Sequence, residues 1–230
     1  MSKIKLDDRL SAVASLVRNG KRVADIGTDH GYLVAYLVEN GICPGGIAAD
    51  LRKGPLENAR QTVIQQGLSD KIELILSDGL ENIPSDACDD IVIAGMGGNL
   101  IAEILEKALW VKDERINIVA QPMTHGEVLR QWYVDNGFSI TKEKTATDGK
   151  RYYCIFCASY TGTKQAHTPS YIYTGEIKPE SETDIKYLKK ILTALTKKYD
   201  ALMSANKEDN DNLKLIIDEI RALMGERDYD

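Results

Sequence analysis

Short hydrophobic runs alternate with helical hydrophobic patterns along the first 160 residues of the chain. The first run ends in Asp25, and further runs span Ile47–Asp50, Ile72–Leu76, Asp90–Ala94 and Asn117–Gln121. Their length and composition predict buried strands. Between them, hydrophobic residues recur every three or four positions, which predicts helices. Strands and helices in alternation are typical of a mostly parallel sheet that is covered by helices.

Glycine, proline and asparagine residues mark where the predicted helices begin and end. Pro55 occupies the first turn of one helix, and Asn99 is expected to cap another. Gly20, Gly67 and Gly137 follow three helix ends. The predicted helices of this part of the chain span 6–19, 31–40, 55–66, 100–108 and 125–136.

The pattern changes after residue 137. Phe138–Thr147 and Tyr152–Tyr160 alternate as strands on either side of an Asp-Gly turn, which predicts a hairpin. The chain therefore has an α/β pattern with a seven-stranded sheet, mostly parallel with its last strand antiparallel. Ordinary dinucleotide-binding domains lack this final hairpin, whereas class I methyltransferases, which have a Rossmann-like sheet, contain it.

The last 70 residues follow a different pattern. Residues 160–180 have weak periodicity and are interpreted as a connection. Hydrophobic residues then recur at spacings of three and four along 185–202 and again along 213–223, which predicts two helices with apolar seams. The short polar break 204–211 indicates an antiparallel, coiled-coil-like helical hairpin. Two domains are expected, residues 1–160 and residues 161–230.

The most informative motif follows the first strand and has the form Asp25-x-Gly27-x-Asp29-x-Gly31. Glycines in a strand-to-helix turn let the backbone approach a ligand, and the helix start offers free N–H groups. The motif does not match the G-x-G-x-x-G pattern of dinucleotide enzymes. It is close to the acidic-x-Gly-x-Gly-x-Gly turn of class I methyltransferases, with Asp29 in place of the middle glycine. An additional anion suits a sulfonium cation better than a pyrophosphate. A plain turn without a ligand is the alternative.

Other predicted strands also end in residues that suit a nucleoside. Asp50 ends the second strand, where an acid typically accepts hydrogen bonds from a ribose; capping of the next helix is the alternative. Asp78 follows the third strand and could reach an adenine amino group, although a simple Asp-Gly turn explains it nearly as well. The glycine-rich segment after the fourth strand indicates a ligand or another backbone nearby. The predicted cofactor-binding residues are Asp25, Gly27, Thr28, Asp29, His30, Gly31, Asp50, Leu51, Asp78, Gly79, Leu80, Ala94, Gly95, Met96 and Gly97.

The residues after the fourth predicted strand also indicate which kind of acceptor atom is methylated. Enzymes that methylate exocyclic amino groups of adenine commonly carry Asp/Asn-Pro-Pro-aromatic after it, whereas this chain has Ala94-Gly95-Met96-Gly97. The absence of a side-chain acceptor and an aromatic ring favours a nucleophile with a lone pair, such as a ring nitrogen. That transfer needs positioning and stabilisation of the positive charge that appears on the ring. Asp29 is the candidate catalytic carboxylate; the alternative is that it only tightens the turn or binds cofactor.

Charge and cysteine content set limits on partners and location. The formal net charge of −6 argues against nonspecific coating of nucleic acid, although local basic clusters occur near the N-terminus and at Lys142, Lys144, Lys150 and Arg151. The four cysteines are expected to be reduced and structural, because Cys154 and Cys157 would point to opposite faces of a strand. Cys88 is expected to be exposed. No signal core or bilayer-length hydrophobic run is visible, so a cytoplasmic protein without a metal site is expected.

The motifs together resemble the TrmK-type bacterial tRNA (adenine(22)-N1)-methyltransferases, which modify adenine 22 of tRNA. The resemblance implies S-adenosyl-L-methionine as cofactor, S-adenosyl-L-homocysteine as its product, and tRNA held between the basic surface and the helical hairpin. Arg9, Lys142, Lys144 and Arg151 are the expected substrate-binding residues. The family pattern has asparagine where this chain has Met123. The segments that carry the resemblance are Leu6–Val13, Asp25–Leu33, Ser77–Leu80, Ala94–Gly98, Gln121–Pro122 and the helical hairpin.

Two alternative functions remain open from the sequence. A class I methyltransferase could act on another RNA or a small molecule, with the helical hairpin serving oligomerisation. A non-catalytic RNA-binding protein that senses the cofactor is also possible, because no residue is an obligatory nucleophile. A monomer or weak homo-oligomer is expected, and a nicotinamide reductase is the least favoured alternative.

Overall fold

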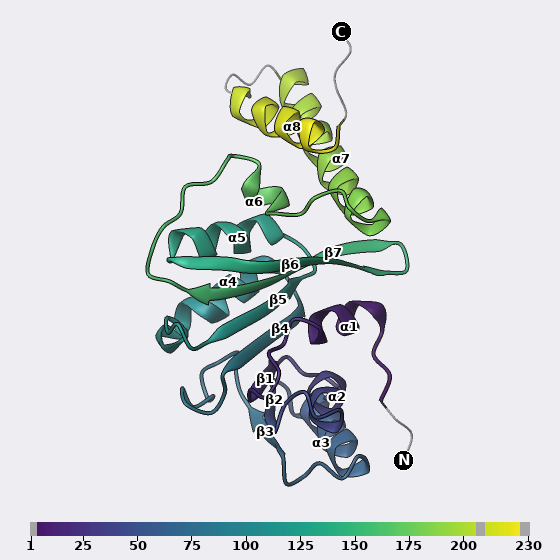
Figure 1. The fold of residues 1–230 in the computed structure, drawn as a ribbon, viewed down its shortest axis with the longest axis vertical. Helices are drawn as coiled ribbons and strands as arrows, with labels where there is room; N and C mark the ends of the chain where they lie inside the picture. The colour runs from purple at the N-terminus through teal and green to yellow at the C-terminus, as the bar shows by residue number, and fades with distance from the viewer. Residues whose placement is uncertain (1–3, 206–209, 226–230) are drawn as a thin grey trace.

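The protein is built around one seven-stranded sheet with a helical hairpin at its side (Figure 1). We describe residues 4–205 and 210–225 of a computed structural model. The strand order is β3-β2-β1-β4-β5-β7-β6. The elements are α1 (Asp8–Ala14), β1 (Val23–Ile26), α2 (Tyr32–Glu39), β2 (Gly46–Asp50), α3 (Lys53–Gln65), β3 (Ile72–Leu76), β4 (Asp90–Met96), α4 (Gly98–Lys107), the 3-10 helix η1 (Leu109–Val111), β5 (Asn117–Pro122), α5 (Gly126–Asp135), β6 (Phe138–Asp148), β7 (Arg151–Tyr160), α6 (Tyr171–Thr174), α7 (Glu182–Ser204) and α8 (Asp211–Leu223).

The first five strands pair in parallel, and β7 is antiparallel to both of its neighbours, β5 and β6. The predicted mostly parallel sheet with an antiparallel last strand is therefore confirmed. The order of the strands reverses between β1 and β4, so the chain leaves these two neighbours in opposite directions. Open α/β sheets bind ligands outside the carboxyl ends of the strands at such a point.

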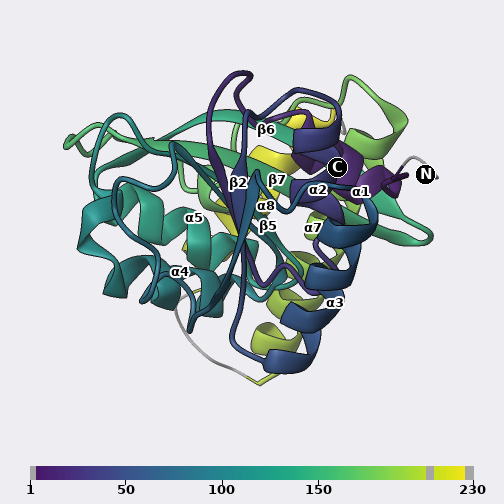
Figure 2. The same cartoon turned by 90° about the horizontal axis from the view of Figure 1, so that it is seen from below.

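Hydrophobic cores lie on both faces of the sheet. One joins α1, α2 and α3 to the strands through residues such as Val13, Val34 and Val63. The other packs α4, α5 and the start of α7 against the opposite face. Figure 2 shows the two helical layers, with α2 and α3 on one side of the strands and α4 and α5 on the other. Cys154 and Cys157 belong to different cores, as the alternation of β7 predicts, and all four cysteines are free and buried.

The C-terminal helices bury their apolar seams against each other and against the sheet. Leu195 on α7 packs with Ile217 and Ile220 on α8, which confirms the predicted hairpin. Nearer its start, α7 contributes Tyr187 and Leu188 to the core that covers the sheet. The hairpin is thus anchored on the sheet at one end and projects beyond it at the other (Figure 1).

A buried ion pair fixes the segment that leads to α7. Arg130 on α5 is fully buried and forms an ion pair with Glu143 on β6. The arginine also donates from Nη1 to the carbonyl oxygen of Ile172 at 2.7 Å, while Glu143 accepts from the backbone N–H of Glu176 at 2.6 Å. The stretch 160–180, interpreted as a connection, therefore contains α6 and is bound to both the helix layer and the sheet.

Three local predictions were wrong. The first helix ends at Ala14 rather than residue 19, because the buried carboxylate of Asp90 binds both the backbone N–H and the side chain of Arg18. Asn99 does not cap α4; Gly97 precedes the helix in extended conformation without a side-chain cap. Cys88 is buried rather than exposed, at 6% accessibility, because it packs into the core on the α4 face.

Candidate active site

The loop after β1, residues Asp25–Gly31, is here called the cofactor turn. Gly27, Asp29 and Gly31 all adopt left-handed backbone conformations, with φ of 74°, 51° and 70°. A Cβ atom at Gly27 would overlap the terminal methyl group of Met96, so the turn has no space for a side chain there. A non-glycine residue in this conformation is strained, and Asp tolerates it better than most residues. The motif thus corresponds to a tightly wound turn.

The carboxylate of Asp25 lies buried beneath this turn. It accepts a hydrogen bond from Thr28 Oγ1 at 2.7 Å, and its residue is 5% exposed. Burial raises the pKa of Asp25 to about 6, and proximity to Asp50 adds to the rise, while hydrogen bonds from Thr28 and from the backbone of Val34 oppose it. The folded protein therefore keeps, next to the turn, a carboxylate whose burial lowers its stability, as expected for a site that binds a cationic group.

Asp50 lies at the carboxyl end of β2, beside the cofactor turn. Its Oδ1 accepts from the backbone N–H of Arg52 at 2.8 Å, so it does assist the entry into α3. Its other oxygen makes no hydrogen bond within the described residues, and the residue as a whole is 6% exposed. Leu51 next to it is 62% exposed, and Asp78 is exposed after β3. Gly79 has φ of 55° and packs against Ile104, which turns the chain so that Leu80 is buried.

The end of β4 lies across from the cofactor turn. Gly95 has φ of 84°, and the side chain of Met96 covers Gly27. The backbone N–H of Met123 donates to the carbonyl oxygen of Met96 at 2.7 Å, and that of Gly98 donates to Thr124 at 2.7 Å. These bonds hold the loops after β4 and β5 together. Of the predicted residues Ala94–Gly97, Met96 thus lies against the turn and is hydrogen-bonded to Met123 in the loop after β5.

Arg9 lies across the ends of β4 and β5. From α1 its Nη1 donates to Oε1 of the buried Gln121 at 2.7 Å and lies 3.8 Å from the position that a Cβ of Gly95 would take. Arg9, predicted to bind substrate, is thus at the site. Gln121 positions it, a role that no local pattern around Gln121 indicated.

Asp29 is exposed at the outer side of the turn. Its carboxylate lies 3.6 Å from Nε2 of His30, and 62% of its side chain is accessible. The ring of His30 stacks on that of Tyr32, with centroids 5.2 Å apart and 8° between the planes. The carboxylate is thus free to face an incoming base, and the structure is compatible with either role considered for Asp29.

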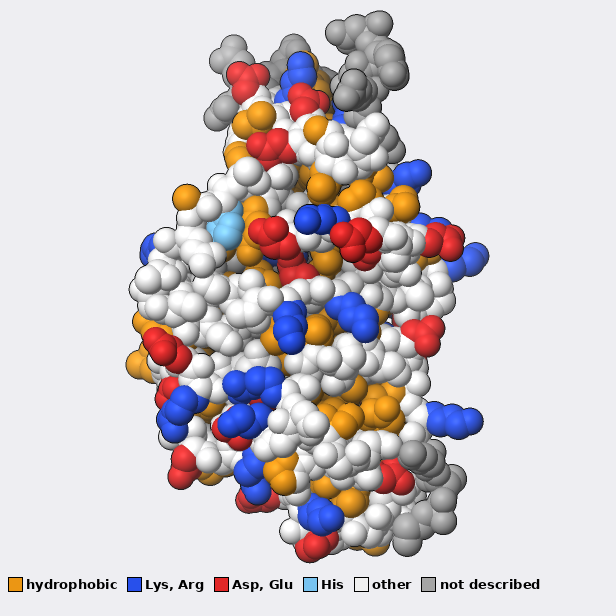
Figure 3. All heavy atoms as spheres, in the orientation of Figure 1, with side chains coloured by type: hydrophobic (Ala, Val, Ile, Leu, Met, Phe, Trp, Pro, Cys, Tyr) orange, Lys and Arg blue, Asp and Glu red, His pale blue; other side chains and the backbone are white. Residues whose placement is uncertain are grey.

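The basic residues grouped by the sequence separate in space. Lys144 donates to Ser15 Oγ on α1 at 3.1 Å. Lys150 and Arg151, at the β6–β7 turn, instead line a cavity beside α7. On the face shown in Figure 3, Lys and Arg side chains are interspersed with Asp and Glu, so this face carries no single basic surface. Any nucleic-acid contact must therefore use local groups of cations.

Comparisons with known proteins agree with this site. A family model described as a methyltransferase domain matches residues 6–156. The chain belongs to this methyltransferase domain family. It is 39% identical to the tRNA (adenine(22)-N(1))-methyltransferase of Bacillus subtilis over 153 residues, a match that covers 66% of this chain and 64% of that protein. The sequence match therefore spans just under two thirds of this relative's length.

Solved structures match this methyltransferase-domain protein over nearly its full length. The B. subtilis M1A22 tRNA methyltransferase TrmK superposes with a TM-score of 0.80 at 29% identity, covering 96% of this chain and 98% of that one. TrmK of M. capricolum in complex with S-adenosyl-homocysteine gives a TM-score of 0.77 at 29% identity and the same coverage. The resemblance to TrmK-type proteins is thus confirmed and extends through the helical hairpin.

None of the helices within residues 4–205 and 210–225 is long and apolar enough to cross a bilayer. The same residues contain no group of three or more His, Cys, Asp or Glu side chains that could hold a metal ion.

Proposed function

We propose that this protein transfers a methyl group from S-adenosyl-L-methionine to N1 of an adenine in tRNA, at position 22. The observation that carries the proposal is the left-handed cofactor turn, with Met96 at the end of β4 lying against Gly27, within a chain 39% identical to an enzyme named for that reaction. The structural match to TrmK covers 96% of this chain, and therefore extends into the helical hairpin, which supports the same assignment.

The residues present fit the proposed cofactor. The space next to Gly27 is filled by the terminal methyl group of Met96, a flexible side chain that can move aside for a ligand. The free oxygen of Asp50 suits a ribose hydroxyl, exposed Leu51 an adenine face, and Asp78 the adenine amino group. Asp25 lies beneath the turn, where it would attract a cationic group. When bound, the cofactor would supply an electrophilic methyl group on a sulfonium centre.

The chain itself would contribute positioning and charge. N1 of adenine carries a lone pair, so no base is needed to create the nucleophile. The ring becomes positive as the bond forms, and a carboxylate nearby stabilises that charge. We assign this role to Asp29, whose side chain is exposed beside the turn. Arg9, held by Gln121 across the ends of β4 and β5, would position the substrate at the entrance.

Recognition of the tRNA would use both parts of the chain. We assign residues 1–160 to cofactor binding and catalysis and residues 161–230 to a helical domain that helps hold tRNA. Arg9, Lys142, Lys144 and Arg151 would contact phosphates, while the target base is turned out of its stack to reach the methyl group. With tRNA as substrate, the protein would act in the cytoplasm, as a monomer or weak homo-oligomer.

Mass spectrometry of nucleosides provides the test. An unmodified tRNA transcript with adenine at position 22 is incubated with protein and S-adenosyl-L-methionine, then digested and searched for 1-methyladenosine. A transcript with guanine at that position is the matched control. One methyl group per transcript, lost in the control, is expected. Absence of 1-methyladenosine, with calorimetry showing that the folded protein binds S-adenosyl-L-homocysteine, would contradict the reaction while leaving the cofactor site intact.

A further inference from the structure

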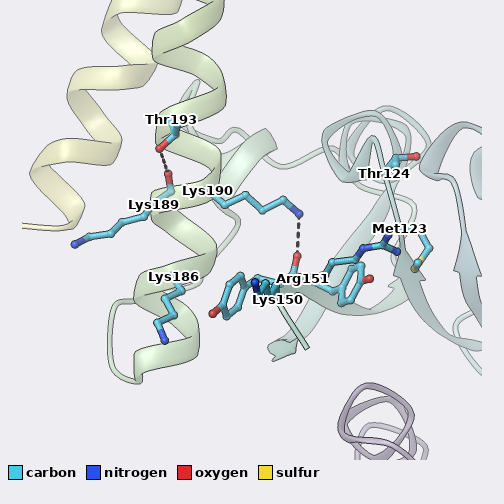
Figure 4. Close-up of a pocket in the computed structure, with 10 residues that line it drawn as sticks. Met123, Thr124, Lys150, Arg151, Lys186, Lys189, Lys190 and Thr193 are labelled. Carbon is cyan, nitrogen blue, oxygen red and sulfur yellow. Dashed lines mark hydrogen bonds between the residues drawn. The ribbon is translucent and has the colours of Figure 1, made fainter. Parts of the chain in front are cut away.

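Two adjoining hollows lie between α7 and the sheet. The first is an open cleft of about 720 Å³, here called the α7 cleft (Figure 4). Its walls come from Met123–Thr124, from Lys150–Tyr153 and from the part of α7 between Lys186 and Thr193. The second is a cavity of about 390 Å³ that extends along α7 as far as Lys198. We call this second hollow the joint cavity, because of the place that it occupies in the fold.

The joint cavity lies where the core of the helical hairpin meets the core of the sheet. Cys154 and Phe156, which line it, belong to the core on the α4 face, whereas Leu195 belongs to the core between α7 and α8. Ile191, another lining residue, packs against both cores. Small-molecule sites of about 300–1,000 Å³ occur preferentially at such junctions. The position and the size of the joint cavity therefore favour a small ligand.

Aromatic side chains from three elements line the joint cavity. Tyr152, Tyr153 and Phe156 come from β7, Tyr173 comes from α6 and Tyr187 comes from α7. Phe156 and Tyr187 are buried, whereas Tyr152 and Tyr173 are half-buried. Aromatic rings offer flat apolar faces and edges against which another ring packs favourably. The lining therefore suits a planar aromatic group better than a flexible or strongly polar one.

The charged residues of the joint cavity favour an anion. Lys190 and Lys198 reach it from α7, and neither forms an ion pair with a described residue. Lys190 Nζ donates to the carbonyl oxygen of Tyr152 at 2.9 Å, and burial lowers the pKa of this lysine. Of the described residues that line the cavity, Glu127 alone is acidic, and its Oε1 lies 3.2 Å from Nδ1 of His125. An occupant with a negative group would therefore complement the lining.

One wall of the joint cavity, the segment Met123–Glu127, is hydrogen-bonded to the end of β4. The backbone N–H of Met123 donates to Met96, and that of Gly98 donates to Thr124, both at 2.7 Å. Within this segment His125 has a left-handed backbone, with φ of 53°, which is strained for a residue other than glycine. A ligand that contacts both this segment and α7 would connect the hairpin to the proposed methyl-transfer site.

We propose that the joint cavity binds a free, small, planar aromatic molecule that carries one anionic group, such as an aromatic carboxylate or sulfonate. Its ring would pack among Tyr152, Tyr173 and Tyr187, and its anion would lie near Lys190 and Lys198. The cavity would thus be an effector site, at which a ligand fixes the hairpin relative to the loop after β5. This inference does not depend on the proposed function, because the site needs neither the cofactor nor tRNA.

Fluorescence titration with 1-anilinonaphthalene-8-sulfonate, an aromatic sulfonate whose emission rises in apolar sites, tests the proposal on the full chain. Excess S-adenosyl-L-homocysteine is present, so that the probe reports a site other than the cofactor turn. We expect one probe per chain with a dissociation constant on the order of 10–100 µM, as for a ligand of this size at ordinary efficiency. Ala194→Trp fills the cavity and should weaken binding by roughly tenfold or more.

Ala201→Trp is the matched control for the filled cavity. Ala201 is exposed on the same helix, two turns beyond Ala194, and does not line the cavity. This variant should bind the probe like the wild type. Equal affinities of Ala194→Trp and Ala201→Trp, or no binding by the wild type, would overturn the site.

Charge reversal tests the anionic group separately. Lys198→Glu changes a lining residue, and Lys197→Glu makes the same change at the next position of α7, which is exposed and does not line the cavity. Affinity for the sulfonate should fall roughly threefold to tenfold in Lys198→Glu alone. N-phenyl-1-naphthylamine, which has the same rings without the sulfonate, should bind both variants equally. An equal loss of sulfonate affinity in both variants would contradict an anion held at Lys198.

Competition with unmodified tRNA distinguishes a free ligand from a nucleotide of an RNA chain, which also combines an aromatic ring with an anion. A free-ligand site predicts that the probe stays bound to the wild type at a tRNA excess. Displacement of the probe by tRNA would overturn the proposal and assign the cavity to the RNA. Formation of 1-methyladenosine without probe binding would remove this inference and leave the proposed function. Probe binding that is lost in Ala194→Trp, without any 1-methyladenosine, would do the reverse.

Discussion

The cofactor turn and the α7 cleft lie along the same edge of the sheet but are built in opposite ways. The turn is one contiguous segment, and its shape follows from left-handed residues at positions 27, 29 and 31. The cleft combines three segments that are distant in the chain and meet because α7 packs on the hairpin. A local site depends on backbone conformation, whereas an assembled site depends on whatever fixes its walls. Variants should therefore damage one without the other.

The largest expected effect is a loss of stability when the buried ion pair between Arg130 and Glu143, which holds the segment before α7, is broken. Glu143→Ala leaves Arg130 buried without its carboxylate and frees the segment before α7, so we expect a loss of roughly 3–5 kcal/mol in the free energy of unfolding. Urea unfolding measures it. The folded fraction should still bind S-adenosyl-L-homocysteine, because the cofactor turn is unchanged. It should bind tRNA more weakly, because α7 is no longer held against the sheet.

Glu180→Ala is the matched control for this change. Glu180 is exposed in the same region, before α7, and forms no ion pair within the described residues. Its loss should change stability by no more than about 0.5 kcal/mol. If Glu143→Ala unfolded at the same urea concentration as this control, the buried pair would not be what holds α7 in place.

The next largest effect is a dependence of folding stability on pH, which arises from the buried Asp25 beneath the cofactor turn. The folded pKa of Asp25, about 6, exceeds the ordinary aspartate pKa of 3.8, so the native state binds a proton that the unfolded chain has lost between those pH values. Stability should therefore fall as pH rises through this window, by about 3 kcal/mol in total. Asp25→Asn should abolish the step and make the protein more stable than wild type at neutral pH.

Urea unfolding at about pH 4, 6 and 7.5 checks this prediction. The exposed Asp70→Asn is the control and should keep the step. Calorimetry should also show weaker S-adenosyl-L-homocysteine binding by Asp25→Asn at neutral pH, because the carboxylate that attracts a cation is gone. If the fall in stability with rising pH persisted in Asp25→Asn, it would arise from another group, and the buried carboxylate of Asp25 would not be its cause.

Gly27→Ala tests whether the turn is built for close approach. A left-handed alanine costs about 1 kcal/mol or more, and overlap with Met96 adds about 1–3 kcal/mol unless that side chain moves. Gly41→Ala is the matched control, because Gly41 has φ of 69° but open space around it. Both should lose stability, but only Gly27→Ala should lose S-adenosyl-L-homocysteine affinity, by roughly tenfold or more. Equal calorimetric affinities would mean that the space above Gly27 does not serve the ligand.

The same contrast explains what the sequence could predict. Strands β1 to β7 and the cofactor turn were predicted because each depends on residues that are close together in the chain. The early end of α1 was not, since Asp90, far along the chain, binds Arg18 there. Likewise, the link between Arg9 and Gln121 spans 112 positions. The five cations of the α7 cleft come from two separate segments, and the pattern of α7 showed only its buried seam.

The smallest effect on stability concerns Asp29, where the turn departs from the all-glycine pattern. Asp29→Gly relieves a left-handed φ of 51° and should stabilise the fold by about 0.5–1 kcal/mol, as thermal or urea unfolding would show. If the carboxylate stabilises charge on the target ring, the same change should lower kcat while the affinity for S-adenosyl-L-homocysteine stays near that of the wild type. Asp29→Asn, which keeps the size and tolerates the same backbone, separates charge from shape. Near-normal turnover of Asp29→Gly at saturating cofactor would mean that Asp29 only shapes the turn. If Asp29→Gly is instead more stable but turns over more slowly, the strained backbone at this position is retained because the reaction needs the carboxylate.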